Sequence, residues 1–80
     1  MKVRVYVTLK TGVLDPAGQA TRNALAGLGF AGVSDVHIGK FIEIELEAAT
    51  KADAEAQARA MSEKLLANLV VEQYRVEVLG

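Results

Sequence analysis

The chain has 80 residues, a net charge of −1 and no cysteine. A chain of this length buries only about 60% of its unfolded surface, so we expect a single domain, residues 1–80, that gains stability by oligomerising. The missing cysteines exclude disulfides and thiolate metal sites, and one histidine is too few for an imidazole-based zinc site. No basic stripe suggests nucleic acid as a partner, and no apolar run is long enough to span a membrane.

The first third of the chain predicts a strand followed by a helix. Within residues 2–10 an apolar residue occupies every second position, which is typical of a half-buried strand and unlike a signal peptide. The loop that follows ends at Asp15 and Pro16, a capping residue and a residue suited to the first helical position. The helix that they begin should end at Gly29, because glycine accepts the left-handed conformation found just past a helix.

Residues 33–48 contain strand-forming residues interrupted by Gly39 and Lys40. The aliphatic residues before and after this pair share one parity, which a two-residue turn would break. We therefore expect a hairpin with an irregular turn at Gly39-Lys40. One unbroken strand over residues 34–47 also keeps the parity, but it would be long for so small a domain. Three glutamates on the opposite face should be solvated or meet cations of a partner: Glu43, Glu45 and Glu47.

The C-terminal half predicts a second helix and a last strand. Thr50 can cap the helix together with Asp53, and an apolar stripe that includes Leu65 runs to a helix end near Asn68. The last strand should span about residues 71–79. The resulting order β-α-β-β-α-β indicates an α+β, ferredoxin-like fold, with a four-stranded antiparallel sheet and both helices on one face.

The residues alone give no support for catalysis. A hydrolytic triad needs a nucleophile, a base and an orienting group, but the chain has two serines and a single histidine, His37, which falls within a strand pattern. The run Lys10-Thr11-Gly12 lacks the glycine spacing of a nucleotide-binding loop, and Asp15 at the helix start would oppose an anion. The residues therefore indicate a small domain that assembles with copies of itself or with another protein.

Three stretches in series carry a resemblance to one family. They are VTLKTGVLDPAGQA (7–20), GVSDVHIGKFIEIELE (32–47) and MSEKLLANLVVEQYRVEV (61–78). Together they resemble the PurS family, the small subunit of phosphoribosylformylglycinamidine synthase, over nearly the whole chain. The family commonly has proline where this chain has Thr11 and Leu69. Both departures lie at loops or helix ends, so they affect loop geometry.

The resemblance implies a role in de novo purine biosynthesis, and a cytoplasmic location fits the missing cysteines. The full enzyme converts formylglycinamide ribonucleotide to formylglycinamidine ribonucleotide, using ATP and glutamine. A large synthetase subunit is expected to hold ATP and magnesium, and a glutaminase subunit to release ammonia. This chain would bind no cofactor and supply no catalytic residue. It would form a dimer or tetramer and bridge the other two subunits so that ammonia passes between their sites.

Eight residues match the family's motifs and are the candidate partner contacts: Lys10, Gly12, Asp15, Pro16, Gly18, Gly39, Lys40 and Asn68. The glycines also fit turns, the Asp-Pro pair a helix start and the asparagine a helix cap. Lysine has no evident structural duty at a turn, so the two lysines are the stronger candidates. The sheet edges are a further candidate surface, because unpaired backbone groups can extend a sheet across a dimer.

Two other functions stay open. The first is a small regulatory domain that binds a metabolite, such as an amino acid, as a dimer. The second is a small enzyme on the same fold that uses His37 and a glutamate.

Overall fold

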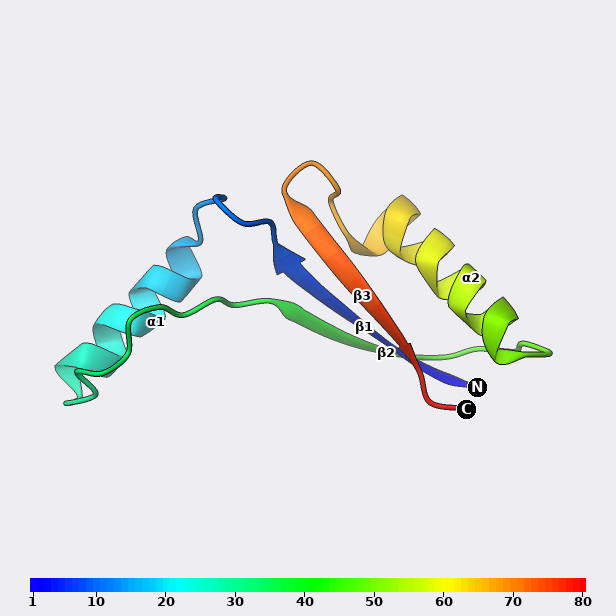
Figure 1. Cartoon of the computed structure of the whole chain (residues 1–80), viewed down its shortest axis with the longest axis horizontal. Coiled ribbons are helices and arrows are strands. Elements are labelled where there is room, and N and C mark those ends of the chain that lie inside the picture. Colours follow the sequence, from blue (N-terminus) through cyan, green and yellow to red (C-terminus); the bar gives the residue numbers. More distant parts are fainter.

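The N-terminal strand forms the centre of the sheet. In the computed structural model, which describes all 80 residues, β1 (Lys2–Leu9) pairs with β2 (Lys40–Glu45) on one side and with β3 (Glu72–Val78) on the other. Both pairings are antiparallel (Figure 1). The α+β class and the positions of the first and last strands are therefore as predicted, and the whole sheet depends on β1.

One face of the sheet carries the core. The three valines of β1 that point to this face are at most 1% exposed: Val3, Val5 and Val7. Helix α2 (Lys51–Met61) lies over them and contributes Ala54 and Ala58, which are fully buried. These small side chains let the helix approach the sheet closely. Only nine of the 80 residues are buried, so the core of a single copy is thin.

The opposite face of the sheet is exposed, and its charges pair within the chain. The Nε of Arg4 donates to Glu43 at 3.0 Å, and its Nη1 lies 3.8 Å from a carboxylate oxygen of Glu77. The Tyr6 hydroxyl also donates to Glu77, at 3.0 Å, while the guanidinium of Arg75 lies 4.1 Å from the centre of the Tyr6 ring. Glu43 therefore meets a cation of its own chain.

The first helix, α1 (Pro16–Gly27), does not lie on the sheet. Figure 1 shows it projecting beyond the end of β1, with the chain returning beside it before entering β2. We call residues 12–39 the arm. It makes the chain elongated, 50 × 25 × 14 Å, with a radius of gyration of 15.9 Å, against about 12 Å for a compact chain of this length. The prediction that both helices cover one face of the sheet is wrong for the single chain.

The hairpin predicted at Gly39-Lys40 is also absent. The chain runs into β2 without a turn, and residues 33–39 pair with no strand, so the sheet has three strands and not four. Gly39 does not have the positive φ of a turn glycine. A Cβ atom at this position would lie 2.5 Å from the carbonyl oxygen of Val7. Gly39 therefore permits close packing against β1, a role that the sequence pattern does not distinguish from a turn.

The second helix begins as predicted and ends with a change of register. The Thr50 side chain caps its first turn. A π-helical turn, Ser62–Leu66, follows α2, and its wider winding shifts the side chains that come after it. Leu65, which was predicted in the apolar stripe, is therefore 83% exposed, whereas Ser62 is fully buried. Neither helix is both long and apolar enough to cross a membrane.

Candidate functional site

Two lysines from different motifs hold the connection between α2 and β3. We call this connection, residues 66–72, the end loop. The Nζ of Lys10 donates to the carbonyl oxygen of Leu69 at 2.6 Å, and the Nζ of Lys40 donates to that of Leu66 at 3.3 Å. Carbonyl groups at the C-terminal end of a helix lack helical partners, and cations there are stabilising. Both lysines therefore have a structural duty, contrary to the reading of the sequence.

Asn68, from the third motif, organises the same loop. Its Oδ1 accepts a hydrogen bond from the N–H of Val70 at 3.1 Å, and its own N–H donates to the Glu72 carboxylate at 2.7 Å. The Glu72 carboxylate also lies 3.9 Å from the Nζ of Lys40. Residues of all three motifs thus converge on the end loop and hold it in one conformation.

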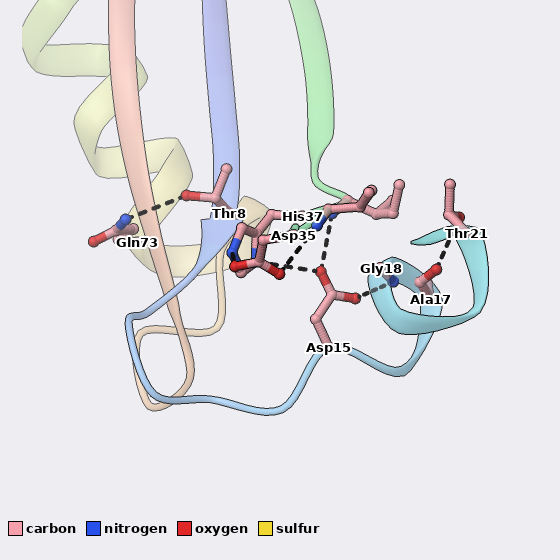
Figure 2. Close-up of polar contacts among 10 residues, drawn as sticks. Thr8, Asp15, Ala17, Gly18, Thr21, Asp35, His37 and Gln73 are labelled. Carbon is pink, nitrogen blue, oxygen red and sulfur yellow. Dashed lines mark hydrogen bonds and ion pairs between the residues drawn. The ribbon is translucent and has the colours of Figure 1, made fainter. Parts of the chain in front are cut away.

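Asp15 joins the two sides of the arm. Its carboxylate accepts a hydrogen bond from the N–H of Gly18 at 2.8 Å (Figure 2) and one from the N–H of Ile38 at 2.9 Å. The first bond caps α1, as predicted, and the second fastens the returning segment to the start of the helix. Asp15 is only 8% exposed. The N–H groups of Ile38 and then Gly18 lower the pKa of Asp15 below the usual value of an aspartate, because they stabilise its ionised form.

The remaining motif residues shape the backbone around Asp15. Gly18 lies where the two sides of the arm touch, and a Cβ atom there would overlap the carbonyl oxygen of Val36. Gly12 has a φ of 86°, a conformation that favours glycine, at the turn out of β1. Pro16 is the first residue of α1, as predicted. The motif residues thus form two clusters. Lys10, Lys40 and Asn68 lie at the end loop, and Gly12, Asp15, Pro16 and Gly18 lie at the base of the arm.

His37 lies beside two aspartates. Its Nε2 is 2.8 Å from a carboxylate oxygen of Asp35, and its Nδ1 is 3.9 Å from one of Asp15 (Figure 2). These contacts are to aspartates and not to the glutamate that the enzyme hypothesis requires. The His37 side chain is 67% exposed. No group of three or more histidine, cysteine, aspartate or glutamate side chains gathers where it could hold a metal ion.

A shallow hollow of about 340 Å³ lies at the base of the arm. Only three of its eight lining residues are hydrophobic, and Asp15, Asp35 and His37 are among the rest. Sites for small organic ligands are lined mainly by apolar side chains. The hollow therefore gives no support to the metabolite-binding hypothesis.

Comparison with known proteins identifies the family. Residues 2–80 match the family described as PurS: phosphoribosylformylglycinamidine (FGAM) synthase. The chain belongs to the PurS family. PurS of Synechocystis is 52% identical to it over 75 residues, which make up 94% of this chain and 75% of that protein. The family expected from the three motifs is confirmed, and the chain is a subunit of FGAM synthase, an enzyme of purine biosynthesis.

Solved PurS structures share the fold. PurS of Bacillus subtilis is 47% identical and superposes with a TM-score of 0.84, covering 95% of this chain and 94% of that one. A chain of the PurLQS structure from Thermotoga maritima is 33% identical, with a TM-score of 0.87 and coverage of 95% and 93%. The architecture described above is therefore that of PurS. The eight candidate partner contacts stay a prediction.

The contact between Gly18 and the returning segment can be tested by substitution. We expect Gly18→Ala to lower the free energy of unfolding by about 1–3 kcal/mol, because the added methyl must displace the Val36 carbonyl. Urea denaturation followed by circular dichroism measures this change. The control is Gly27→Ala in the same helix, where a Cβ has nothing within 4 Å and a gain of up to about 1 kcal/mol is expected. Equal stability of the two variants would contradict the contact.

The Asp15 carboxylate should make the fold sensitive to acid. Its pKa is lower in the folded chain than in the unfolded chain, so its contribution is present at neutral pH and is lost as the pH falls below about 4. Asp15→Asn should be less stable than the wild type at neutral pH, because a neutral amide binds two N–H groups less well. The difference should shrink in acid.

Urea denaturation across this pH range measures the effect, with Glu47→Gln, at an exposed carboxylate outside the helices, as the control. A difference between wild type and Asp15→Asn that stays constant with pH would show that the ionised form of Asp15 does not matter.

Proposed function

We propose that this chain is the non-catalytic assembly subunit of FGAM synthase, and that it bridges the synthetase and glutaminase subunits and supports the transfer of ammonia between them. The proposal rests on the groups that the motif side chains bind. Lys10, Lys40, Asn68 and Asp15 bind backbone groups of their own chain, so they shape surfaces and do not face a common reacting atom. The relative from Thermotoga maritima is a chain of a PurLQS structure.

In the proposed complex the chemistry belongs to the partners. ATP and magnesium bind to the large synthetase subunit, the glutaminase subunit releases ammonia from glutamine, and this chain binds no cofactor. The complex works in the cytoplasm, together with the rest of the pathway.

We also propose that copies of the chain associate, because a single copy leaves part of its sheet uncovered. Helix α2 lies over β1 and β3, so Ile42 and Ile44 of β2 are only half-buried. The outer edge of β2 has no partner strand. Residues 33–38 also lack a partner strand, and they carry Val36 and Ile38 in the same parity as the two isoleucines of β2.

A two-fold axis near Gly39 would supply a partner strand both to the open edge of β2 and to residues 33–38. Residues 33–38 of one copy would then run antiparallel to residues 40–45 of the other, along the open edge of β2. Because the two copies would pair symmetrically about Gly39, even-numbered residues of one copy would lie opposite even-numbered residues of the other. The aliphatic side chains of both segments would then share one face of the sheet. Each sheet would gain a fourth strand, and the partner's α1 would cover its apolar face beside α2. This is the ferredoxin-like arrangement, completed between two copies, and a tetramer would be a pair of such dimers.

The dimer can be tested at Ile38, which is exposed in a single copy. Light scattering should give the wild type at least twice the 8.5 kDa of one chain. Ile38→Glu should give one chain mass, because it places a charge on the shared apolar face. Ala31→Glu, in an exposed turn of the arm, should keep the wild-type mass. A monomeric wild type, or a dimeric Ile38→Glu, would exclude this pairing.

Reconstitution tests the assembly role. The synthetase and glutaminase subunits should form the amidine from glutamine only when this chain is added, because the chain holds the two active sites together. With ammonium salt in place of glutamine, the synthetase should need the chain much less, since no transfer between subunits is required. The proposal fails if full glutamine-dependent activity is reached without the chain.

A further inference from the structure

We propose that the exposed face of the sheet carries a binding site, a hollow that takes the phosphate group of a small phosphate ester. We call it the β3 hollow. It has a volume of about 390 Å³ and is lined by five residues of β1 and β3: Tyr6, Thr8, Gln73, Tyr74 and Arg75. The proposal goes beyond the assembly role, which assigns no ligand to this chain, and it can be tested on the chain alone.

The pairing of β1 with β3 brings the side chains of the hollow together. Thr8 lies directly opposite Gln73, and Tyr6 lies directly opposite Arg75. Residues two apart on a strand point to the same face of the sheet, so both pairs stand on the face that does not carry the core. Side chains that are opposite or diagonal on neighbouring strands lie within reach of one another. These four side chains therefore form one patch, as the hollow that they share shows.

Arg75 supplies the charge of the hollow. Its guanidinium lies 4.1 Å from the centre of the Tyr6 ring, a contact that holds the side chain against the sheet. Arg4 and Arg59 are paired with glutamates, whereas Arg75 forms no ion pair and no side-chain hydrogen bond within the chain. A guanidinium whose N–H groups are free can bind two oxygens of one anion at once. No carboxylate lines the hollow, so Arg75 gives it a positive charge.

Two neutral side chains add donors beside the guanidinium. The Nε2 of Gln73 donates to the Oγ1 of Thr8 at 3.4 Å (Figure 2). Because the Thr8 oxygen is the acceptor in this contact, its own O–H group is free to donate, and the Gln73 amide keeps a second N–H group. Arginine together with threonine and glutamine is a donor set that proteins use to bind phosphate oxygens.

The donor set favours a phosphate ester over a carboxylate. The two oxygens of a carboxylate are already satisfied by one guanidinium, whereas a phosphate monoester has three acceptor oxygens and can also use the neutral donors. The hollow is larger than one phosphate group, so it has room for part of the organic portion of a small ester. Beside it the rings of Tyr6 and Phe41 lie 5.4 Å apart between centres, and Phe41 is 56% exposed. Aromatic surface of this kind is available to a sugar or a base.

The β3 hollow does not overlap with the proposed contact between copies. That contact uses the outer edge of β2 and the arm, whereas the residues of the hollow belong to β1 and β3, on the other side of the sheet (Figure 1). The hollow at the base of the arm shares none of these residues and contains two aspartates, so it does not compete for an anion. Each copy in a dimer would therefore carry one phosphate site.

Nuclear magnetic resonance of the isolated chain tests the site. Titration with adenosine monophosphate, ribose 5-phosphate or inorganic phosphate should shift the amide signals of Thr8, Gln73 and Arg75, and added salt should weaken the binding. The order of affinity among the three shows whether the sugar or the base contributes. Adenosine, which lacks the phosphate, and acetate, which is a carboxylate, should each bind at least about tenfold more weakly than adenosine monophosphate.

Substitutions assign the binding to the hollow. Arg75→Gln should weaken the binding of adenosine monophosphate at least about tenfold, because the guanidinium is lost. Thr8→Val keeps the shape of the side chain and should weaken it about threefold, because one hydrogen bond is lost. Arg22→Gln is the matched control, since it removes the same charge from an exposed arginine of α1, and it should bind like the wild type. Circular dichroism and the mass from light scattering should be unchanged in all three variants.

Phosphate compounds that shift no signal around the hollow would overturn the proposal, as would equal binding of adenosine and its monophosphate. Unchanged binding by Arg75→Gln, or an equal loss in Arg75→Gln and Arg22→Gln, would also overturn it, because the anion would then not be held by this hollow. These measurements use the chain without the synthetase and glutaminase subunits. A failed reconstitution would therefore remove the assembly role and leave the phosphate site to be judged by its own result.

Discussion

The Asp15 carboxylate accepts hydrogen bonds from two N–H groups that are far apart in the chain, one in the first turn of α1 and one at Ile38, just before β2. Separating the two sides of the arm would leave a buried carboxylate or a backbone N–H without a partner, which costs free energy comparable to a lost hydrogen bond. The register of β2 on β1 begins two residues later, at Lys40. The direction of the arm is therefore coupled to the register of the sheet through one side chain.

The loop between β1 and α1 has a second attachment on its other side. Lys10, five residues before Asp15, binds the end loop through its ammonium group and also through its backbone N–H, which donates to Val71 at 2.9 Å. One short loop thus holds the arm through Asp15 and the end loop through Lys10. This arrangement accounts for the dense run of special residues between the first strand and the first helix, without any ligand or reacting group.

Local signals in the sequence were sufficient for the first strand, the last strand and the starts of both helices. The alternation in β1, the cap at Thr50 and the pair Asp15-Pro16 depend on contacts within a few residues, and each was read correctly. Gly29, with a φ of 99°, lies just past α1 as expected. Placement of the elements was harder, because it depends on contacts that sequence spacing does not contain. Gly39 looks like a turn glycine until the carbonyl of Val7 is found beside it.

Contacts between residues far apart in the sequence also explain why the candidate site was predicted only in part. The premise that Lys10 and Lys40 have no structural duty was wrong, because their carbonyl partners lie 59 and 26 residues away and spacing does not reveal them. Their role as partner contacts stays a prediction. Leu65 fits a helical stripe, and only the π-helical turn removes it from the core. No residue pattern in this segment indicates such a turn, so the exposure of Leu65 was not predicted.

The thin core and the exposed apolar side chains have a common origin. A three-stranded sheet with one helix over it cannot enclose the remaining aliphatic residues, and polar side chains fasten the segments that the core does not reach. The exposed large hydrophobic residues then fall largely into two groups. The arm carries Leu14, Leu28, Phe30 and Ile38, and the π-helical turn with the end loop carries Leu65, Leu69 and Val70.

The first group lies on the segment that leads into β2 and the second on the segment that leads into β3, the two strands that flank β1. A compact ferredoxin-like monomer would have buried the first group against its own sheet and kept only the second. Holding the arm away from the sheet therefore leaves a chain of 80 residues with two separate groups of exposed apolar side chains. The self-association proposed above would cover the first group and leave the second exposed.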